Sequence, residues 1–361
     1  MTNYLLAGGG TAGHVNPLLA VAEHIRATEP DAQIVVLGTA EGLESRLVPQ
    51  RGFELVTIPK VPFPRRPDVA ALRFPGRFAQ AVRASRTLIR DRSIDVVAGF
   101  GGYVSTPAFL AARAERVPLV VHEANARPGL ANRLGARFTT AVGVVFPSTP
   151  LPHSTLVGMP LRPELERIAS DAAARRALRL EALDTFGFDP KRPVLLVTGG
   201  SLGARRINAT VRERAAELVD AGWSVLHLVG GSPEIDDPGI TGYVQLRYLD
   251  RMDLALACAD AAIARSGSAT VSELTAMQVP AIYIPYPVGN GEQRLNAASI
   301  VDAGGALLVN DADFSPNRLD VITREVLANG ARLERMRAAC VGLGIVDGTA
   351  RTLELIRSVL T

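Results

Sequence analysis

Short, uninterrupted runs of apolar residues recur along this chain, and longer segments of mixed polarity separate them. Such runs are typical of strands that are buried on both faces of a parallel sheet, and the longer segments are typical of the helices that cover it. The pattern therefore predicts an α/β protein built from doubly wound parallel sheets. Strands are predicted at residues 4–7, 34–37, 95–100, 119–122, 141–146, 194–197, 225–229, 243–248, 261–264, 281–285 and 306–309.

The length of the chain favours two such domains. At 361 residues it is long for one domain, and its 47% hydrophobic and 21% charged residues are typical of a globular α/β protein. Proline and glycine punctuate residues 158–163, as is common at a domain boundary. We therefore expect a first domain over residues 1–161 and a second over 162–344, with a last helix in 345–361 that packs back on the first.

Glycine-rich turns follow three of the predicted strands, at residues 8–14, 101–105 and 199–204. Glycines between a strand and a helix bring backbone amides close to an anion, and the helix dipole adds positive potential there. The turns therefore predict phosphate or pyrophosphate sites at the carboxyl edges of the sheets. Two alternatives stay open: plain strand-to-helix turns, or a dinucleotide site in which the first turn is a G-x-G-x-x-G fingerprint and Glu41 is its acid.

Polar side chains at the ends of two strands in the first domain are candidates for catalysis. His14 stands at the entrance of the first helix. Because histidine titrates near neutral pH, His14 is a candidate general base, or else a polar residue of the helix start. The sequence His122-Glu123-Ala124-Asn125 ends another strand. Asn125 is suited to a sugar hydroxyl, and Glu123 is either a second base or a carboxylate that caps the following turn.

The second half of the chain carries candidates for binding a nucleotide sugar. Ser201, at a helix start, is suited to a diphosphate, and Arg162, between two prolines, is either a phosphate ligand or a solvated linker residue. Glu273 lies in the helix that follows a second turn of this half, where a carboxylate suits the two hydroxyls of a ribose. The acid–amide pair Glu292-Gln293 suits neighbouring hydroxyls of a hexose.

Positive charge gathers in the first domain. The whole chain has a net charge of +3, but residues 1–161 hold 17 Lys and Arg against 11 Asp and Glu. Most of the excess lies in Lys60–Arg92, where apolar Phe63, Leu72 and Phe74 are interleaved with arginines. We interpret this segment as a surface for anionic lipid headgroups, with the solvated face of a core helix as the alternative.

Composition narrows the classes of function further. Aromatic residues make up only 5% of the chain, which disfavours binding of single-stranded nucleic acid by base stacking. The two cysteines, Cys258 and Cys340, form no disulfide framework, and no cluster of His or Cys residues indicates a metal site. The chain enters a strand at its start without a signal segment, and prolines interrupt its longest uncharged stretch. These features predict a cytosolic protein that binds no nucleic acid and touches a membrane.

Together, these motifs resemble those of one family, MurG, the peptidoglycan N-acetylglucosaminyltransferases of glycosyltransferase family 28. The resemblance implies the GT-B fold, which is α/β with two doubly wound Rossmann-like domains and a cleft between them. It also implies inverting transfer of GlcNAc from UDP-GlcNAc to the C4 hydroxyl of MurNAc in lipid I, which gives UDP and lipid II with a β-1,4 linkage. The similar blocks cover nearly the whole chain, at residues 8–17, 101–105, 122–133, 158–162, 199–208, 265–273 and 292–297.

The resemblance also implies roles for individual residues. His14 would be the catalytic base, with Glu123 as the runner-up. The acceptor's pyrophosphate would contact Gly10, Gly13, Gly101, Gly102, Tyr103 and Ser105. UDP-GlcNAc would contact Thr11, Ala12, Gly13, Asn125, Arg162, Ser201, Leu249, Ser268, Ala269, Thr270, Val271, Ser272, Glu273 and Gln293.

Location and partners follow from the same resemblance. The protein would be peripheral on the cytoplasmic face of the plasma membrane, with UDP-GlcNAc, lipid I, anionic phospholipid at Lys60–Arg92 and proteins of cell-wall synthesis as partners. No cofactor is required, and a divalent cation is compatible with the sequence but not indicated by it. Ala12, Ala124 and Met159 depart from the family's usual Gly, Gln and Asn, but they remove no residue that the mechanism needs.

Three other functions remain as alternatives. The chain could be a different GT-B transferase that acts on a diacylglycerol or an aglycone, a UDP-GlcNAc 2-epimerase, or a dinucleotide-binding protein. The turn at residues 101–105 and the block 122–125 argue against the first of these.

Overall fold

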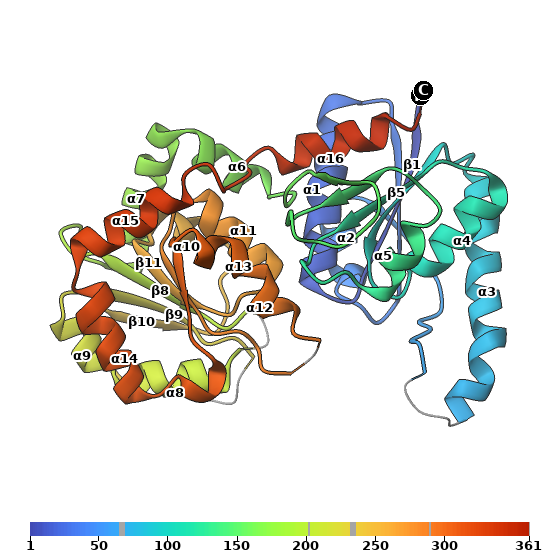
Figure 1. Ribbon diagram of the computed structural model, residues 1–361. Coiled ribbons are helices and arrows are strands. Elements are labelled where there is room, and N and C mark those ends of the chain that lie inside the picture. Colours follow the sequence, from blue (N-terminus) through green and yellow to red (C-terminus); the bar gives the residue numbers. More distant parts are fainter. Residues whose placement is uncertain (65–68, 201–202, 232–235, 289, 361) are drawn as a thin grey trace. The chain divides into compact units, whose positions relative to one another are not determined.

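The computed structural model describes residues 1–64, 69–200, 203–231, 236–288 and 290–360 of the chain (Figure 1). The chain divides into two compact units. The first comprises Met1–Arg162 together with Asp347–Thr361, and the second comprises Pro163–Val346. Each unit is an α/β domain with its own sheet and its own hydrophobic core.

The described residues of the first unit form a seven-stranded parallel sheet in the order β3-β2-β1-β4-β5-β6-β7. Helices cover both faces of this sheet, as a fully parallel sheet requires (Figure 1). The strands are β1 (Asn3–Gly8), β2 (Gln33–Gly38), β3 (Glu54–Thr57), β4 (Val96–Gly101), β5 (Leu119–Glu123), β6 (Val142–Val144) and β7 (Ser154–Leu156). The helices are α1 (Ala12–Thr28), α2 (Glu44–Gln50), α3 (Val69–Asp91), α4 (Ser105–Glu115), α5 (Leu130–Gly135) and α16 (Gly348–Arg357).

Successive residues of β1 point to opposite faces of the sheet. Leu5 and Ala7 belong to one buried cluster, and Tyr4 and Leu6 belong to the cluster on the other face. Because both faces are covered, this strand has no polar face, which is why it appears in the sequence as an uninterrupted apolar run.

The last helix of the chain is anchored on the first unit. α16 lies beside α1 (Figure 1), and its Leu353 and Ile356 are buried in the core. Arg357 Nη2 lies 2.6 Å from Glu29 Oε1 at the end of α1, and the hydroxyl of Tyr4 donates to the other oxygen of the same carboxylate at 2.8 Å. The end of the chain therefore completes the unit that its beginning starts.

The second unit repeats the architecture, with a six-stranded parallel sheet among its described residues in the order β10-β9-β8-β11-β12-β13. The strands are β8 (Val194–Thr198), β9 (Ser224–Leu228), β10 (Tyr243–Leu246), β11 (Ala261–Ala264), β12 (Ala281–Tyr283) and β13 (Ala306–Leu308). The helices are α6 (Pro163–Ser170), α7 (Ala172–Phe186), α8 (Arg205–Glu213), α9 (Ala215–Asp220), α10 (Met252–Cys258), α11 (Ser268–Ala276), α12 (Glu292–Asn296), α13 (Ala298–Asp302), the 3-10 turn η1 (Asp311–Asp313), α14 (Pro316–Ile322), the π turn η2 (Thr323–Leu327) and α15 (Gly330–Cys340).

Each sheet has a point at which the strand order reverses. In the first unit the chain runs from β1 outward to β2 and β3 and then returns past β1 to β4. In the second it runs from β8 outward to β9 and β10 and then returns past β8 to β11. Ligands of doubly wound sheets bind beyond the carboxyl ends of the strands at such points, and glycine turns follow β1, β4 and β8 there.

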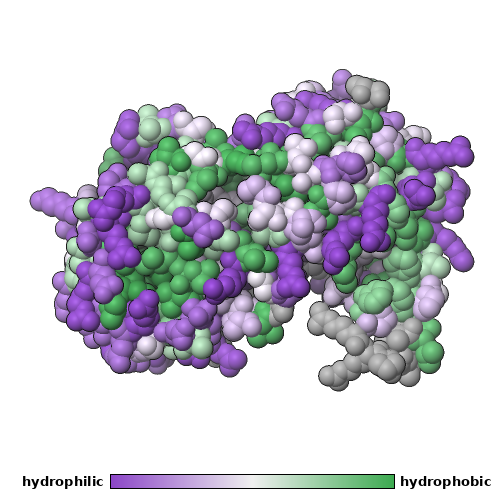
Figure 2. All heavy atoms as spheres, viewed as in Figure 1, coloured by the Kyte–Doolittle hydropathy of each residue, from purple (hydrophilic) through white to green (hydrophobic). Residues whose placement is uncertain are grey.

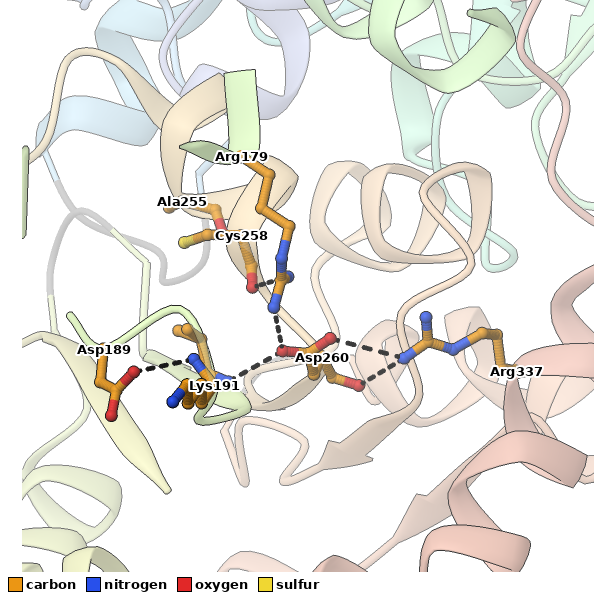
Figure 3. Close-up of polar contacts among 8 residues, drawn as sticks. Arg179, Asp189, Lys191, Ala255, Cys258, Asp260 and Arg337 are labelled. Atoms are coloured by element: carbon orange, nitrogen blue, oxygen red, sulfur yellow. Dashed lines mark hydrogen bonds and ion pairs between the residues drawn. The ribbon is translucent and has the colours of Figure 1, made fainter. Parts of the chain in front are cut away.

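One carboxylate ties together the opposite, amino-terminal edge of the second sheet. Asp260 precedes β11, and its Oδ2 accepts from the backbone N–H of Val194 at 2.9 Å and from Arg179 of α7 at 2.8 Å (Figure 3). Arg337 of α15 approaches the other oxygen at 3.8 Å, and Arg179 also donates to the carbonyl of Cys258. Three helices are thereby fixed to β8 and β11, which leaves the carboxyl edge of the sheet for ligands.

The predicted fold class is confirmed, and every predicted strand is present. The structure adds β3 and β7, two strands that the hydrophobic pattern did not indicate. In the described part of the chain, no helix has both the length and the apolar character needed to cross a membrane.

Candidate active site

The first two glycine turns pack directly against each other. β1 and β4 are neighbours, and Gly8 is paired with Gly101, so both strands end at the same place. A Cβ atom on Gly102 would lie 2.4 Å from the carbonyl oxygen of Gly9, and Gly102 has a φ of +86°. Because a side chain is excluded there by contact and by backbone conformation, glycine is required for this approach.

His14 lies over this junction. Its Nδ1 is 3.1 Å from the carbonyl oxygen of Gly9 and 3.3 Å from Thr11 Oγ1. A Cβ on Gly101 would lie 2.9 Å from Nε2 and Cδ2 of the ring, so the imidazole rests on the Gly101 backbone. A carbonyl oxygen only accepts hydrogen bonds, so Nδ1 carries the hydrogen in this arrangement and Nε2 keeps its lone pair. The half-buried ring is therefore set up to take a proton at Nε2.

A fully buried carboxylate, Glu44, lies beneath the first glycine turn. Its Oε2 accepts from the backbone N–H of Gly10 at 2.8 Å, and its Oε1 accepts from the N–H and the hydroxyl of Thr39 at 2.9 and 2.8 Å. Burial by itself would raise the pKa of this carboxyl, but hydrogen bonds from Gly10, from its own backbone and from Thr39 outweigh that effect and lower the pKa. Glu44 is therefore ionised at neutral pH.

Sequence reasoning missed Glu44. It considered Glu41, which is exposed, as the acid at the end of the second strand. The signal in the sequence was a second acid three residues after Glu41. In the structure, a Cβ on Gly9 or Gly42 would lie 2.4 or 2.0 Å from a Glu44 carboxylate oxygen. The glycine at position 9 is thus explained by room for Glu44, not by approach to a phosphate.

Some of the remaining residues predicted to contact the pyrophosphate have backbone N–H groups available to a ligand, and others are held by hydrogen bonds within the protein. Nothing in the described chain accepts from the N–H groups of Ala12 and Gly13 at the start of α1, whereas the N–H of Gly10 is held by Glu44. Tyr103 is 45% exposed, with Lys60 Nζ 6.0 Å from its ring centre. Ser105 is fully buried, and its Oγ accepts from Gly101 N and lies 2.8 Å from Gly101 O, which closes the second turn.

Glu123 is buried in the turn that follows β5, and four donors surround it. Oε1 accepts from the backbone N–H of Asn125 at 2.9 Å and from its side-chain amide at 3.4 Å. Oε2 accepts from the N–H of Gly129 at 2.9 Å and from Asn132 Nδ2 at 3.0 Å. This is the geometry of a carboxylate that caps a turn, with Asn125 held beside it.

His122, next to Glu123, is buried and neutral. Burial lowers the pKa of this imidazole to about 4, and its Nε2 lies 3.3 Å from the carbonyl oxygen of Gly158. The ring packs against Phe100 with 5.3 Å between the ring centres. His122 therefore supports the floor of the site without titrating at physiological pH.

A cavity of about 890 Å³ opens at the carboxyl edge of the second sheet. The turn after β8 forms one wall, and a Cβ on Gly230 would lie 2.4 Å from the backbone nitrogen of Gly203, so this turn also depends on a close backbone approach. The cavity is lined by Gly199, Gly203, Ala204, Arg205, Arg206, Ala209, Thr210, Gly231, Arg265, Tyr286, Pro287, Val288, Gln293 and Asp311.

The polar groups of this cavity orient Gln293. Its Oε1 accepts from the backbone N–H of Tyr286 at 2.9 Å, so its Nε2, which has no acceptor among the described residues, is the end available to a ligand. Arg265 lies over the Tyr286 ring, donates to the carbonyl oxygen of Ile284 at 2.9 Å, and forms a 2.6 Å ion pair with Asp311. Sequence reasoning did not single out Asp311.

The remaining predicted donor residues lie on several separate elements of the chain. Residues 268–272 open α11, whose first amides have no side-chain cap, and Glu273 is half-buried one turn into that helix. Leu249 is in the loop that follows β10. Arg162 is the last residue of the first unit before α6. Ser201 lies outside the described residues.

Carboxylates in the described part of the chain form no group of three metal-binding side chains. Asp311-Ala312-Asp313 has the spacing of an acidic pair, but Asp311 is paired with Arg206 and Arg265. Asp313 Oδ2 accepts from the side-chain amide of Asn310 at 2.9 Å.

The basic segment behaves differently in its two halves. Arg86 and Arg90 donate to Glu115 of α4 at 2.6 and 2.7 Å, and hydrogen bonds from Arg90 and Arg86 lower the pKa of Glu115 to about 2. These two charges are thus compensated within the unit. The predicted lipid residues Arg65 and Arg66 lie outside the described residues.

The first half of the segment instead exposes apolar side chains. Phe63 and Leu72 are 67% and 83% exposed, and Phe63, Phe74 and Phe78 form a row of aromatic contacts with 5.4 Å between ring centres. Figure 2 shows apolar residues at the surface near the start of α3.

Comparison with known proteins shows the family of this chain. The models of the glycosyltransferase family 28 N-terminal and C-terminal domains match residues 4–144 and 194–351. The chain is 58% identical over 361 residues to the UDP-N-acetylglucosamine--N-acetylmuramyl-(pentapeptide) pyrophosphoryl-undecaprenol N-acetylglucosamine transferase of Leifsonia xyli subsp. xyli, and the match covers 100% of this chain and 99% of that protein.

Solved structures show the same similarity. A crystal structure of MurG from Acinetobacter baumannii matches with a TM-score of 0.79 and 26% identity, over 99% of this chain and 100% of that one. A UDP-GlcNAc 2-epimerase from Neisseria meningitidis matches with a TM-score of 0.69 over 99% and 100% of the two chains, but at 12% identity it shares the fold alone.

Proposed function

This chain belongs to glycosyltransferase family 28 and is a hexosyltransferase of the MurG type, and we propose how its residues carry out the transfer of GlcNAc from UDP-GlcNAc to undecaprenyl-pyrophosphoryl-MurNAc-pentapeptide. The observation that carries this proposal is His14 on the paired glycine turns, with Nδ1 bonded to Gly9 O and Nε2 left to accept a proton.

His14 is the general base of the reaction. Its Nε2 takes the proton of the C4 hydroxyl of MurNAc as that oxygen forms a bond to the anomeric carbon of GlcNAc. The bond from the anomeric carbon to the UDP oxygen breaks, and its electron pair leaves with UDP. Attack from the side opposite the leaving group inverts the α linkage of the donor to β. Glu123, whose oxygens already accept four hydrogen bonds, positions Asn125 and the turn instead of taking the proton.

The acceptor's pyrophosphate binds at the paired turns of the first unit. The uncapped amides of Ala12 and Gly13 at the start of α1 supply donors, and the helix dipole adds positive potential. Lys60 adds a cation beside the exposed ring of Tyr103. Ser105 and the glycines at positions 101 and 102 shape this site. The N–H of Gly10 donates to Glu44 and not to the phosphate.

UDP-GlcNAc binds at the carboxyl edge of the second sheet. Glu273 accepts hydrogen bonds from the ribose hydroxyls, Leu249 lies by the uracil, and Gln293 donates through Nε2 to a GlcNAc hydroxyl, as its hydrogen bond to Tyr286 supports. Ser201, Arg162 and the amides at the start of α11 stabilise the diphosphate as its negative charge grows, without a required cofactor.

The start of α3 places the enzyme on an anionic membrane surface on the cytoplasmic side, where the acceptor lipid lies. Exposed Phe63 and Leu72 insert into the interface, and exposed Arg73, Arg77 and Arg83 contact lipid phosphates. Cell-wall synthesis proteins that share this lipid are candidate partners. Arg86 and Arg90, which are held by Glu115, stabilise the packing of the helix and contribute little to lipid binding.

Transfer of labelled GlcNAc from UDP-GlcNAc to a short-chain analogue of the acceptor tests the function directly, with UDP release followed in the same reaction. The expected result is a lipid-linked disaccharide formed in equal amount to UDP. UDP release without this product, or ManNAc formed from the donor alone, would contradict the proposal and favour hydrolase or epimerase chemistry.

Replacement of His14, the proposed base, should lower the turnover number. His14→Ala is expected to lower kcat by roughly 10²–10⁴-fold, the usual contribution of a general base, with little change in the KM for UDP-GlcNAc. His24→Ala, on the same helix, is the matched control and should be close to wild type. Near-normal turnover of His14→Ala would remove His14 from the mechanism.

Replacement of the ribose ligand should act on donor binding. Glu273→Ala is expected to raise the KM for UDP-GlcNAc about 10- to 100-fold, since a hydrogen bond to a charged acceptor contributes about 1.5–3 kcal/mol. Steady-state kinetics at saturating acceptor measure this effect, with Glu334→Ala, an exposed acid of α15, as the control. An unchanged donor KM in Glu273→Ala would displace UDP from this site.

The membrane surface is tested with vesicles. The double variant Phe63→Ser/Leu72→Ser should bind vesicles of phosphatidylglycerol and phosphatidylcholine roughly 10-fold more weakly or worse, because burial of one such side chain contributes about 1.5–3 kcal/mol. Co-sedimentation measures binding, and Leu180→Ser, at a 64% exposed leucine of α7, is the control. Equal binding by the two variants would place the membrane contact elsewhere.

A further inference from the structure

One peptide group connects the buried carboxylate Glu44 to the imidazole of His14. The N–H of Gly10 donates to Glu44 Oε2 at 2.8 Å, and the carbonyl oxygen of Gly9 is 3.1 Å from His14 Nδ1. These two backbone atoms belong to the same peptide unit, the bond between Gly9 and Gly10. The chain of hydrogen bonds therefore runs from the carboxylate through one peptide group to the ring nitrogen.

The electrostatics of this arrangement favour one state of the imidazole. A carboxylate that accepts from a peptide N–H pushes electron density toward the carbonyl oxygen of the same group, and hydrogen bonds in a chain strengthen one another in this way. The Gly9 carbonyl is thus a stronger acceptor for the hydrogen on Nδ1. The same polarisation stabilises the positive charge that forms when Nε2 takes a proton.

The position of Glu44 is fixed more firmly than a surface carboxylate would be. It is fully buried, and Thr39 supplies two further donors to its other oxygen, so its charge is compensated without a cationic partner among the described residues. The glycines at positions 9 and 42 leave space that is filled by the carboxylate. A negative charge directly beneath a turn that binds a pyrophosphate would disfavour the anion, so phosphate binding alone does not account for it.

We propose that Glu44 is a positioning residue for the transfer reaction, which acts through the Gly9–Gly10 peptide to hold His14 with its hydrogen on Nδ1 and to increase the basicity of Nε2. This inference rests on the proposed role of His14 as the base. In a catalytic triad, a buried carboxylate contacts the catalytic histidine directly. Here Glu44 has the same role but acts through one peptide group.

Few other titratable groups face the imidazole. His122 of β5 is within electrostatic reach, but burial holds its pKa at about 4, so it stays neutral over the range in which the enzyme is assayed. Glu44 of α2 lies on the other side of the turn. A change in the pH profile on substitution of Glu44 therefore reports on His14.

The variant Glu44→Gln tests the connection because a side-chain amide of the same shape has only one acceptor oxygen. If that oxygen keeps the donors from Thr39, the amide nitrogen faces the N–H of Gly10, and the hydrogen bond to the peptide is lost. We expect kcat to fall roughly 10- to 100-fold, the range seen when an outer hydrogen-bond partner of a working histidine is removed. The KM for UDP-GlcNAc should stay unchanged, and the acid limb of the kcat/KM profile should move to lower pH.

A double-mutant cycle separates this role from a structural one. If Glu44 acts through His14, Glu44→Gln should cost almost nothing further in a His14→Ala background. Equal losses in both backgrounds would mean that Glu44 only stabilises the fold and would overturn the inference. Glu41→Gln, an exposed acid three residues away, is the matched control, and thermal unfolding of every variant identifies losses that come from instability.

The outcomes distinguish this inference from the proposed function. If His14→Ala keeps near-normal turnover, the base itself is wrong and the role of Glu44 falls with it. If His14→Ala is inactive while Glu44→Gln matches Glu41→Gln, only the connection through the peptide is wrong.

A measurement without turnover gives an independent answer. The chain has five histidines, so ¹⁵N labelling of histidine with the His14→Ala variant for assignment reports the tautomer of this ring. We expect the hydrogen on Nδ1 in the unaltered protein and a shift toward Nε2 in Glu44→Gln. A ring protonated at Nε2 in the unaltered protein, or one that does not respond to Glu44→Gln, would overturn the inference.

Discussion

The contact between two glycine turns, in which the backbone of Gly102 lies against the carbonyl of Gly9, is the constraint on which the first unit depends. It arises because β1 and β4 are neighbours in a parallel sheet and end together, at the point where the strand order reverses. The contact leaves no room for a side chain, and it supports the ring of His14 on Gly101. The position of one histidine thus follows from sheet topology and from backbone packing that only glycine allows.

The second unit uses the same topology for a different purpose. Its glycine turn after β8 packs closely against Gly230. No histidine of the described residues lies on this turn, and an open cavity with Arg265, Asp311 and Gln293 lies there instead. At the opposite edge of this sheet, Asp260 accepts hydrogen bonds from Arg179 and from the backbone of Val194. In the proposed mechanism, one unit presents a proton acceptor beside amides for a phosphate, and the other presents oriented donors and acceptors for a nucleotide sugar.

The sequence predicted the buried strands of this fold well and missed two exposed edge strands. Central strands are covered on both faces and so appear as apolar runs, whereas β3 and β7 lie at the sheet edges and are partly or fully exposed, without a run to mark them. The sequence motifs were enough to identify the family, but the contacts of individual side chains depend on the tertiary structure. The burial of Glu44 as an anion depends on hydrogen bonds from Gly10 and Thr39, which are distant or unmarked in the sequence. Likewise, Arg86 and Arg90 form ion pairs with Glu115, which lies on a different helix.

The central claim is that one histidine base drives a single displacement at the anomeric carbon of an α-linked donor. The configuration of the product tests this claim most directly. The enzyme would be supplied with UDP-GlcNAc and a short-chain acceptor, and the coupling of the new anomeric proton would be measured by NMR on the isolated disaccharide. The account predicts the large coupling of a β linkage in all of the product. An α linkage would require two displacements or a different attack geometry, and it would contradict the account.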